Sequence, residues 1–470
     1  MISTPSRLRL SLAALTLVCS TCAPFSLGAT APKAKQLPFP DFGFMAAPGQ
    51  YTGPVFKLSQ DYPATKPGAD KIPAFFSKFP KTLTADFSNW QAYMMAVRDY
   101  CFEGNLDIDW RVQENKVRPW YHIPWQHYGA AGREGIHGLT KEAPVQPNQL
   151  AVGQGQPVPG DFYQTYAVGF FNDFGGYGIG QVWADHMKPN PGATTKPNGF
   201  PNGTVISKLL FVDVPPAQVP SLVNPVQWQG YIQLTYGNPK RSIRTLSLIQ
   251  MDIAVRDDRA PLGWVFGTFQ YNGALNNPVP WKNLIPVGIM WGNDPTITDS
   301  AYDNPTPGVT KINPNLKETS INPNPKELPP THLGWNGRLN GPVDNPMSSC
   351  LSCHMTAEVP TLSPLNPLFQ ANPPAVGSPA WMRWFANGPC GVPFDADAQS
   401  ADFSLQLAMG IANFQEWAPP AQSGLFAADY ETPPVATAAE GATPRLKAAK
   451  PTKRKVYPII RDVVDPHEDK

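Results

Sequence analysis

The sequence carries little charge and almost no excess of either sign. Charged residues make up 16% of the 470 residues, and the formal net charge is +1. Proteins that bind nucleic acid present basic patches or stripes, and no extended basic stripe occurs in this chain. We therefore expect no nucleic-acid partner. Aromatic residues, at 11%, are too frequent for the composition of a disordered chain.

Apolar runs long enough to cross a membrane are also missing. The apolar stretch of residues 10–18 is too short to span a bilayer comfortably, and no later segment is long enough. This stretch follows Arg7 and Arg9 and precedes the small residues Ala29 and Ala31, as in a secretory signal peptide. We predict a signal peptide at residues 1–31 and no integral membrane segment after its cleavage. The expected location is the periplasm of a Gram-negative-type bacterium.

Cysteine is scarce, with six in the chain, two of them inside the predicted signal peptide. Of the other four, Cys350 and Cys353 belong to a motif discussed below, which leaves Cys101 and Cys390. Exported proteins often pair two spare cysteines. We therefore predict a disulfide between Cys101 and Cys390, and two buried free thiols are the alternative.

Continuous periodic segments are few, because 56 prolines and 38 glycines interrupt the chain. Hydrophobic spacing predicts helices at residues 87–102 and 403–417. Alternating patterns predict strands at residues 162–171, 204–214, 246–256 and 264–271. No strand–helix–strand rhythm is present, so a parallel nucleotide-binding sheet is not expected. The predicted fold class is α+β and β-rich, an antiparallel sheet with long Pro/Gly-rich loops and few helices.

One motif carries chemistry: Cys350-Leu-Ser-Cys353-His354. Two thiols three positions apart, followed at once by a histidine, are what covalent attachment of haem c requires. The thiols bond to the haem, and His354 is the proximal iron ligand. A redox dithiol needs no following histidine, and a zinc site needs a second ligand pair at short spacing. The sequence therefore predicts one covalently bound haem c.

The sixth iron ligand is less clear from the sequence. Met409 is the candidate for an electron carrier, although it also fits an ordinary core position. The rival ligands, or distal acid–base groups, are His122, His127 and His137, and Arg133 could pair with a haem propionate. His186 and His332 have less support. The alternative is a weak or missing sixth ligand, with aromatic walls on the distal side formed by Phe170, Phe171, Phe174 and Tyr177 beside a run of glycines.

Three segments in one order resemble a known family: residues 200–208 (FPNGTVISK), 263–271 (GWVFGTFQY) and 349–354 (SCLSCH). They resemble the β-sheet mono-haem cytochromes, namely the lysine-crosslinked hydroxylamine-oxidising type and the beta form of cytochrome c-prime. The resemblance implies a haem packed on an antiparallel sheet with an open distal face. It also implies thioethers at Cys350 and Cys353, His354 as proximal ligand and Lys208 as the crosslink candidate. More broadly, the chain resembles large bacterial proteins of the cytochrome c family.

These observations divide the chain into four parts: the signal peptide at residues 1–31, a Pro-rich wrap with one helix and a His/aromatic segment at 32–160, a β-sheet and haem c domain at 161–417, and a loosely ordered basic, Pro-rich tail at 418–470. The predicted function is periplasmic electron transfer with a redox partner protein. The alternative is a haem enzyme or gas-binding protein that acts on a small nitrogen or oxygen species at an open distal site. A third interpretation is an electron-relaying subunit of a larger complex. The sequence leaves the substrate, the redox potential and the oligomeric state open.

Overall fold

The computed structural model describes most of the chain between residues 38 and 417. The predicted signal peptide at 1–31 and the predicted tail at 418–470 lie outside the described residues. No helix of the described part is both long enough and apolar enough to cross a membrane. The described ranges are 38–39, 43–78, 87–126, 133–145, 147–150, 163–233, 240–303, 310–328 and 333–417.

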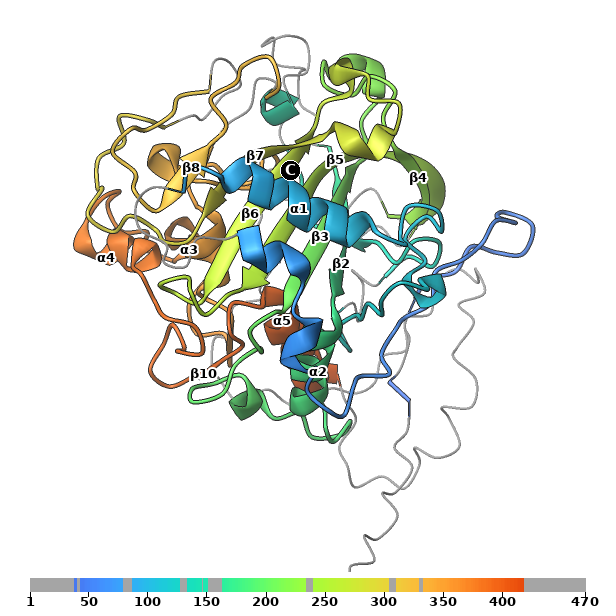
Figure 1. The fold of residues 1–470 in the computed structure, drawn as a ribbon, viewed down its shortest axis with the longest axis horizontal. Helices are drawn as coiled ribbons and strands as arrows, with labels where there is room; N and C mark the ends of the chain where they lie inside the picture. The colour runs from blue at the N-terminus through green and yellow to red at the C-terminus, as the bar shows by residue number, and fades with distance from the viewer. Residues whose placement is uncertain are drawn as a thin grey trace, which may run out of the picture. The chain divides into compact units, whose positions relative to one another are not determined.

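An eight-stranded sheet, antiparallel at every pairing, forms the centre of the fold (Figure 1). The strands follow the order β1-β2-β3-β5-β6-β7-β8, and β4 pairs with the long central strand β5. The predicted β-rich antiparallel fold is thus confirmed. The strands are β1 (Thr140–Lys141), β2 (Thr165–Phe171), β3 (Val205–Val212), β4 (Gln227–Ile232), β5 (Ser242–Arg256), β6 (Trp264–Tyr271), β7 (Leu284–Met290) and β8 (Thr319–Ile321).

Both faces of the sheet are covered. Successive residues of a strand point to opposite faces, and here they alternate between two separate hydrophobic clusters. On β5, Ile253 and Val255 belong to the first cluster, and Ala254 belongs to the second. Strands β2, β6 and β7 are buried along their whole length for this reason.

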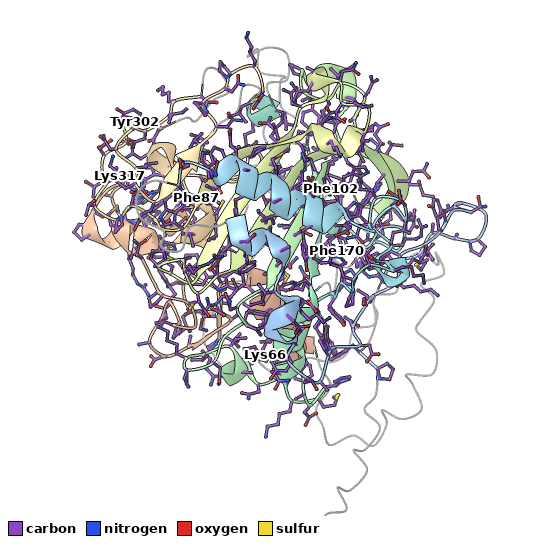
Figure 2. All side chains as sticks on the ribbon, viewed as in Figure 1. Lys66, Phe87, Phe102, Phe170, Tyr302 and Lys317 are labelled. Atoms are coloured by element: carbon purple, nitrogen blue, oxygen red, sulfur yellow. The ribbon has the colours of Figure 1, made fainter. Side chains whose placement is uncertain are left out.

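The first face packs against α1 (Trp90–Phe102). Tyr93, Met94 and Val97 of this helix are fully buried against the strands. Figure 2 labels Phe87 and Phe102 near the two ends of α1, and Phe170 on the sheet beneath. The helix predicted at 87–102 is confirmed, and it begins three residues later than predicted.

The second face packs against α3 (Cys350–His354) and α5 (Leu405–Trp417), and in the view of Figure 1 α5 lies behind the strands. Leu351 of α3 and Leu407 and Ile411 of α5 are fully buried in the second cluster. The helix predicted at 403–417 is therefore confirmed. Smaller elements complete this side: α4 (Pro379–Met382) and a two-stranded antiparallel sheet of β9 (Glu358–Val359) and β10 (Gln399–Ser400).

The glycine-rich segment after β2 forms a helix, α2 (Asp173–Val182), that the sequence analysis missed. The Asn172 side chain caps it by accepting a hydrogen bond from the Gly175 N–H at 3.1 Å. Because its glycines have no side chain, aromatic rings of the protein pack closely against this helix. A Cβ at Gly176 would lie only 2.4 Å from the Tyr121 ring. The aromatic wall predicted on the distal side of the haem is therefore wrong. Its members do not share one surface, because Phe170 and Phe171 belong to opposite faces of the sheet.

The predicted disulfide is also wrong. Cys101 is buried in the first cluster on α1, whereas Cys390 packs against the second cluster, so the sheet lies between them. All four cysteines of the described residues are free thiols. Burial raises the pKa of Cys101 to about 12.

We expect Cys101 and Cys390 to be recovered as thiols from unreduced protein. Alkylation in denaturant followed by peptide mass spectrometry should label both. In the native protein, Cys101 should resist alkylation, because its thiol is buried and un-ionised. A peptide pair joined through these two cysteines would contradict the structure.

Candidate haem attachment site

The Cys350–His354 motif forms a single short helix, α3, whose first turn is closed by two serines. The Ser349 hydroxyl oxygen accepts a hydrogen bond from the Ser352 N–H at 3.0 Å, and the Ser352 hydroxyl oxygen accepts one from the Ser349 N–H at 2.7 Å. This reciprocal pair is a capping box. This capping box was not predicted, although a serine before the motif and another three positions later are visible in the sequence.

The motif's side chains divide between two directions. Leu351 points into the second cluster and Ser352 is buried in the cap. Cys350, Cys353 and His354 keep partial exposure. Their spacing of three and four positions places them on one side of a helix. The fold therefore presents together the three side chains that the sequence selects.

His354 is held in one tautomer. Its Nδ1 lies 2.8 Å from the main-chain oxygen of Phe403. A carbonyl oxygen only accepts, so Nδ1 carries the proton and Nε2 keeps a free lone pair. The ring also packs against Phe266 of β6, with 4.8 Å between centroids. Burial lowers the pKa of His354 to about 4, so the imidazole is neutral at pH 7. Metal-binding histidines are oriented in this way.

The two thiols differ from those of a redox dithiol. Burial raises the pKa of Cys350 well above its usual value, and the charges of Asp252 and Asp344 add to the effect. Burial likewise raises the pKa of Cys353 to about 11. Reactive dithiols need a lowered pKa, because the thiolate is the nucleophile. Within the described residues, no group of three or more His, Cys, Asp or Glu side chains could hold a metal ion.

A row of polar side chains crosses the sheet on the face that packs against α3. Lys208 of β3, Asp252 of β5 and Thr268 of β6 are neighbours in register. Asp252 shares its face with Ala254 of the second cluster, two residues further along the strand. The Asp252 carboxylate accepts hydrogen bonds from the Thr268 hydroxyl at 2.6 Å and from the Gln250 amide at 2.9 Å. We call Lys208, Asp252 and Thr268 the polar row.

The charged groups in and around the polar row shift one another's pKa values. The Gln250 amide also donates to Asp344 at 3.1 Å, so two carboxylates meet at one amide group. Burial and the charge of Asp344 raise the pKa of Asp252 to about 7. Lys208 lies 3.2 Å from Glu142. Burial works to lower the Lys208 pKa, but Glu142, Asp344 and Asp252 outweigh it and the pKa is raised.

His122 is directed away from α3. Its ring packs against Phe56 and Phe170 of the first cluster, with centroids at 4.7 Å and 5.4 Å. Its Nδ1 accepts a hydrogen bond from the Ser59 N–H at 2.9 Å. The neutral ring therefore carries its proton on Nε2, which leaves no lone pair for iron. The interpretation of His122 as a ligand is wrong. Arg133 stacks on the same Phe56 ring.

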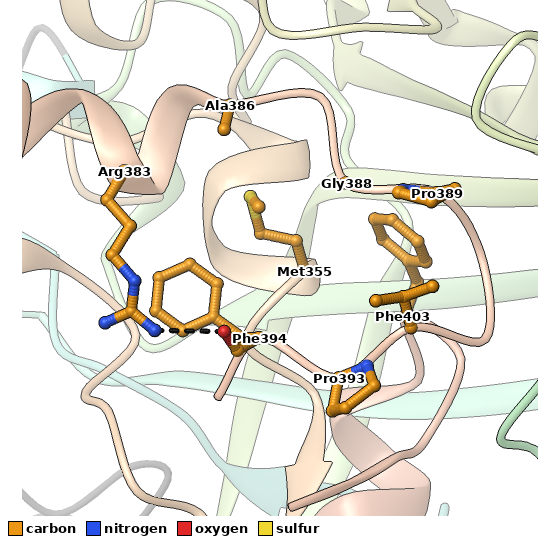
Figure 3. A pocket seen from close by; sticks show the side chains of 9 residues that line it. Met355, Arg383, Ala386, Gly388, Pro389, Pro393, Phe394 and Phe403 are labelled. Carbon is orange, nitrogen blue, oxygen red and sulfur yellow. Dashed lines mark hydrogen bonds between the residues drawn. The ribbon is translucent and has the colours of Figure 1, made fainter. Parts of the chain in front are cut away.

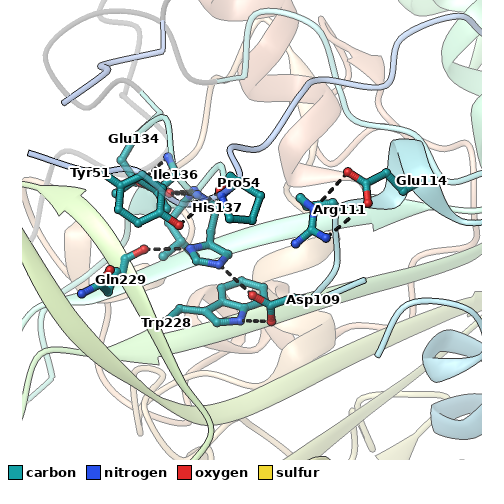
Figure 4. A network of polar contacts seen from close by, with 11 residues as sticks. Tyr51, Pro54, Asp109, Arg111, Glu114, Glu134, Ile136, His137, Trp228 and Gln229 are labelled. Atoms are coloured by element: carbon teal, nitrogen blue, oxygen red, sulfur yellow. Dashed lines mark hydrogen bonds and ion pairs between the residues drawn. The ribbon is translucent and has the colours of Figure 1, made fainter. Parts of the chain in front are cut away.

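His137 is engaged elsewhere. Its ring stacks on Trp228 with 4.3 Å between centroids. Nδ1 lies 2.7 Å from the Gln229 carbonyl oxygen and Nε2 lies 3.1 Å from Asp109. Figure 4 draws both contacts as dashed lines. Neither ring nitrogen is available to iron, so this interpretation is wrong as well. His186 stacks on Phe39 at 3.7 Å, and His127 and His332 lie outside the described residues.

Met409 lies on α5, partly buried against the second cluster, which also contains Leu351 of α3. Its role as sixth ligand stays a prediction. Met355, the residue after His354, lines a separate pocket of about 180 Å³ (Figure 3). Phe403 also lines this pocket, whose other walls are Arg383, Ala386, Gly388, Pro389, Val392, Pro393 and Phe394.

A carboxyl pair follows α3 in the chain. Glu358 of β9 is completely buried and accepts a hydrogen bond from the Asp395 N–H at 2.7 Å. Burial and the nearby Asp395 carboxylate raise the pKa of Glu358 to about 8. Glu358 is therefore largely protonated at neutral pH. Glu358 lies on the short sheet, opposite Ser400 of β10.

We expect the protein to lose stability as the pH rises from about 4.5 to about 8. Glu358 binds its proton more tightly in the folded chain than in the unfolded chain, where its pKa is about 4.5. Its stabilising contribution is complete below the lower pKa and is lost as the pH rises through the higher one. Glu358→Gln should flatten this part of a melting-temperature profile, and Glu103→Gln on the surface is the control. An equal slope in both variants would contradict the assignment.

Comparison with protein-family models, with curated proteins and with solved structures found no match. The chemistry of α3 and its surroundings therefore carries the functional interpretation.

Proposed function

We propose that the protein is an exported mono-haem c-type cytochrome that transfers electrons in the periplasm. Haem c would be bound through Cys350 and Cys353, with His354 as proximal ligand. One observation carries the proposal: His354 is fixed with Nδ1 on the Phe403 carbonyl and Nε2 free, beside two thiols on the same side of one helical turn. The expected reaction partner is a redox protein.

The residues of α3 fit this cofactor chemically. Cys350 and Cys353 would hold the haem through thioethers, formed by addition of each S–H across one vinyl group, which consumes no oxidant. The Phe403 carbonyl orients the His354 ring and increases the basicity of Nε2. Leu351 anchors the helix in the second cluster, so the ring cannot turn with the backbone. The bound haem would supply one-electron chemistry at its iron.

A second function, a haem enzyme or gas-binding protein with an open distal site, is favoured by a different observation. His122 and His137 are engaged elsewhere, while the polar row brings groups able to donate or accept protons to the face of the sheet that α3 packs on. Proton transfer accompanies most redox reactions of small nitrogen and oxygen species. The family resemblance adds a crosslink from Lys208 to the haem as part of this alternative.

We expect the purified, exported protein to carry one haem that stays bound in a denaturing gel and in acid acetone. Replacing either Cys350 or Cys353 by alanine should remove one thioether and lower haem retention. Cys101→Ala and Cys390→Ala, which alter thiols outside the motif, should leave it unchanged. A haem that extracts from the wild-type protein would refute the proposal. Mass spectrometry of the same haem peptide would show whether Lys208 is joined to it.

Absorption spectra with and without carbon monoxide should separate the two functions. A carrier with Met409 as sixth ligand should be low-spin and inert to the gas, and Met409→Ala should convert it to high spin. An open distal site should be five-coordinate and bind carbon monoxide, with no effect of Met409→Ala. In either case, His354→Ala should change the coordination and the spectrum while the thioethers persist. A spectrum unaffected by His354→Ala would exclude it as proximal ligand.

A further inference from the structure

We infer that Asn293 is a positioning residue that holds both ends of α3 and so sets the orientation of His354. The inference rests on the proposed haem function. It starts from a constraint on α3: a helix of five residues has too few internal hydrogen bonds to be stable alone. Its geometry must be imposed by residues outside it.

The Asn293 side chain reaches the residues that flank the motif on each side. At the beginning of α3, its Oδ1 accepts a hydrogen bond from the Ser349 hydroxyl at 2.7 Å. At the end of α3, its Nδ2 lies 3.8 Å from the Met355 sulfur and donates to the Ala386 carbonyl oxygen at 3.1 Å. One buried amide thus joins the N-cap, the C-cap and the neighbouring segment.

Asn293 is itself fixed by a buried arginine. The Arg338 side chain is fully buried, and its Nε donates to the Asn293 carbonyl oxygen at 2.7 Å. Its Nη2 donates to the carbonyl oxygens of Asp294 at 2.9 Å and Ile297 at 2.7 Å. The guanidinium also lies over the rings of Trp335 and Phe385. A lysine could not donate this set of diverging hydrogen bonds, because it lacks the planar guanidinium group.

This arrangement links the sheet to α3. Asn293 lies three residues after the end of β7, so its main chain continues from a strand buried along its whole length. The His354 ring is thus oriented from two sides. Phe403 fixes Nδ1 directly, and Asn293 fixes the helix that carries the ring. Loss of either contact would leave the orientation of the His354 ring less restricted.

The test compares Asn293→Ala and Asn293→Asp with Asn322→Ala in the haem-loaded, full-length protein. Asn322 is a matched control: it is equally buried, follows strand β8 directly, and its Nδ2 donates to the Pro286 carbonyl oxygen at 3.1 Å. Because thioether bonds are covalent, all variants keep the haem. A changed spectrum then reports altered coordination, not cofactor loss.

We expect Asn293→Ala to replace the single wild-type spectrum with a mixture of spin states and to shift the midpoint potential. Asn293→Asp keeps the acceptor for Ser349 but places a carboxylate oxygen against the Ala386 carbonyl oxygen in a buried site, so it should show the same spectral change as Asn293→Ala. Asn322→Ala should lower the melting temperature without changing spectrum or potential. Arg338→Lys should reproduce the spectral change of Asn293→Ala, which provides a second variant if the alanine variant does not fold.

Two outcomes overturn the inference, and they are distinguishable. If the Asn293 and Arg338 variants lose stability but keep the wild-type spectrum and potential, Asn293 has no positioning role. If the wild-type protein carries no covalent haem, the proposed function fails, and this inference fails with it.

Discussion

The burial of the central sheet on both faces is the constraint on which the rest of the structure depends. A sheet with one face in water could leave polar side chains to the solvent, but here each must find a partner within the protein. Asp252 meets this requirement through Thr268 and Gln250, and Lys208 meets it through Glu142. The polar row is therefore an ordered network, not a set of solvated residues. The sheet itself separates Cys101 on one face from Cys390 on the other.

The second face also explains how a very short helix can carry a fixed imidazole. Leu351 anchors α3 to the hydrophobic cluster, the Ser349–Ser352 pair closes its first turn, and the Phe403 carbonyl selects the tautomer of His354. The residues between and around Cys350 and Cys353 thus supply the rigidity of the motif.

Much of the fold could be predicted from local sequence patterns. The alternation in residues 246–256 identified β5, although the polar Gln250 on this strand proved to be fully buried. Strand β7 was missed because a continuous apolar run that contains Pro286 shows no alternation. Helix α2 was missed because its glycines oppose helix formation locally, and aromatic packing overrides that preference.

The candidate site also has one part that could be predicted from the sequence and another that could not. The motif is contiguous and could be identified from five residues, but its supports come from distant positions. Phe403 is 49 residues from His354, and Asn293 is 56 residues from Ser349. No local pattern encodes such pairings. The predicted disulfide and the histidine ligands failed for this reason, since each assumed a proximity that only the tertiary structure determines.

The chain order of the supports around α3 has a consequence for the order in which the site can form. Strands β1 to β7 pair with near neighbours in the sequence and can form as soon as residue 290 has emerged. The residues at 350–354 then lack Phe403, which emerges about fifty residues later. Until Phe403 is in place, the contact that fixes the His354 ring cannot form. The motif is therefore fixed only when the segment that leads into α5 packs on the second face.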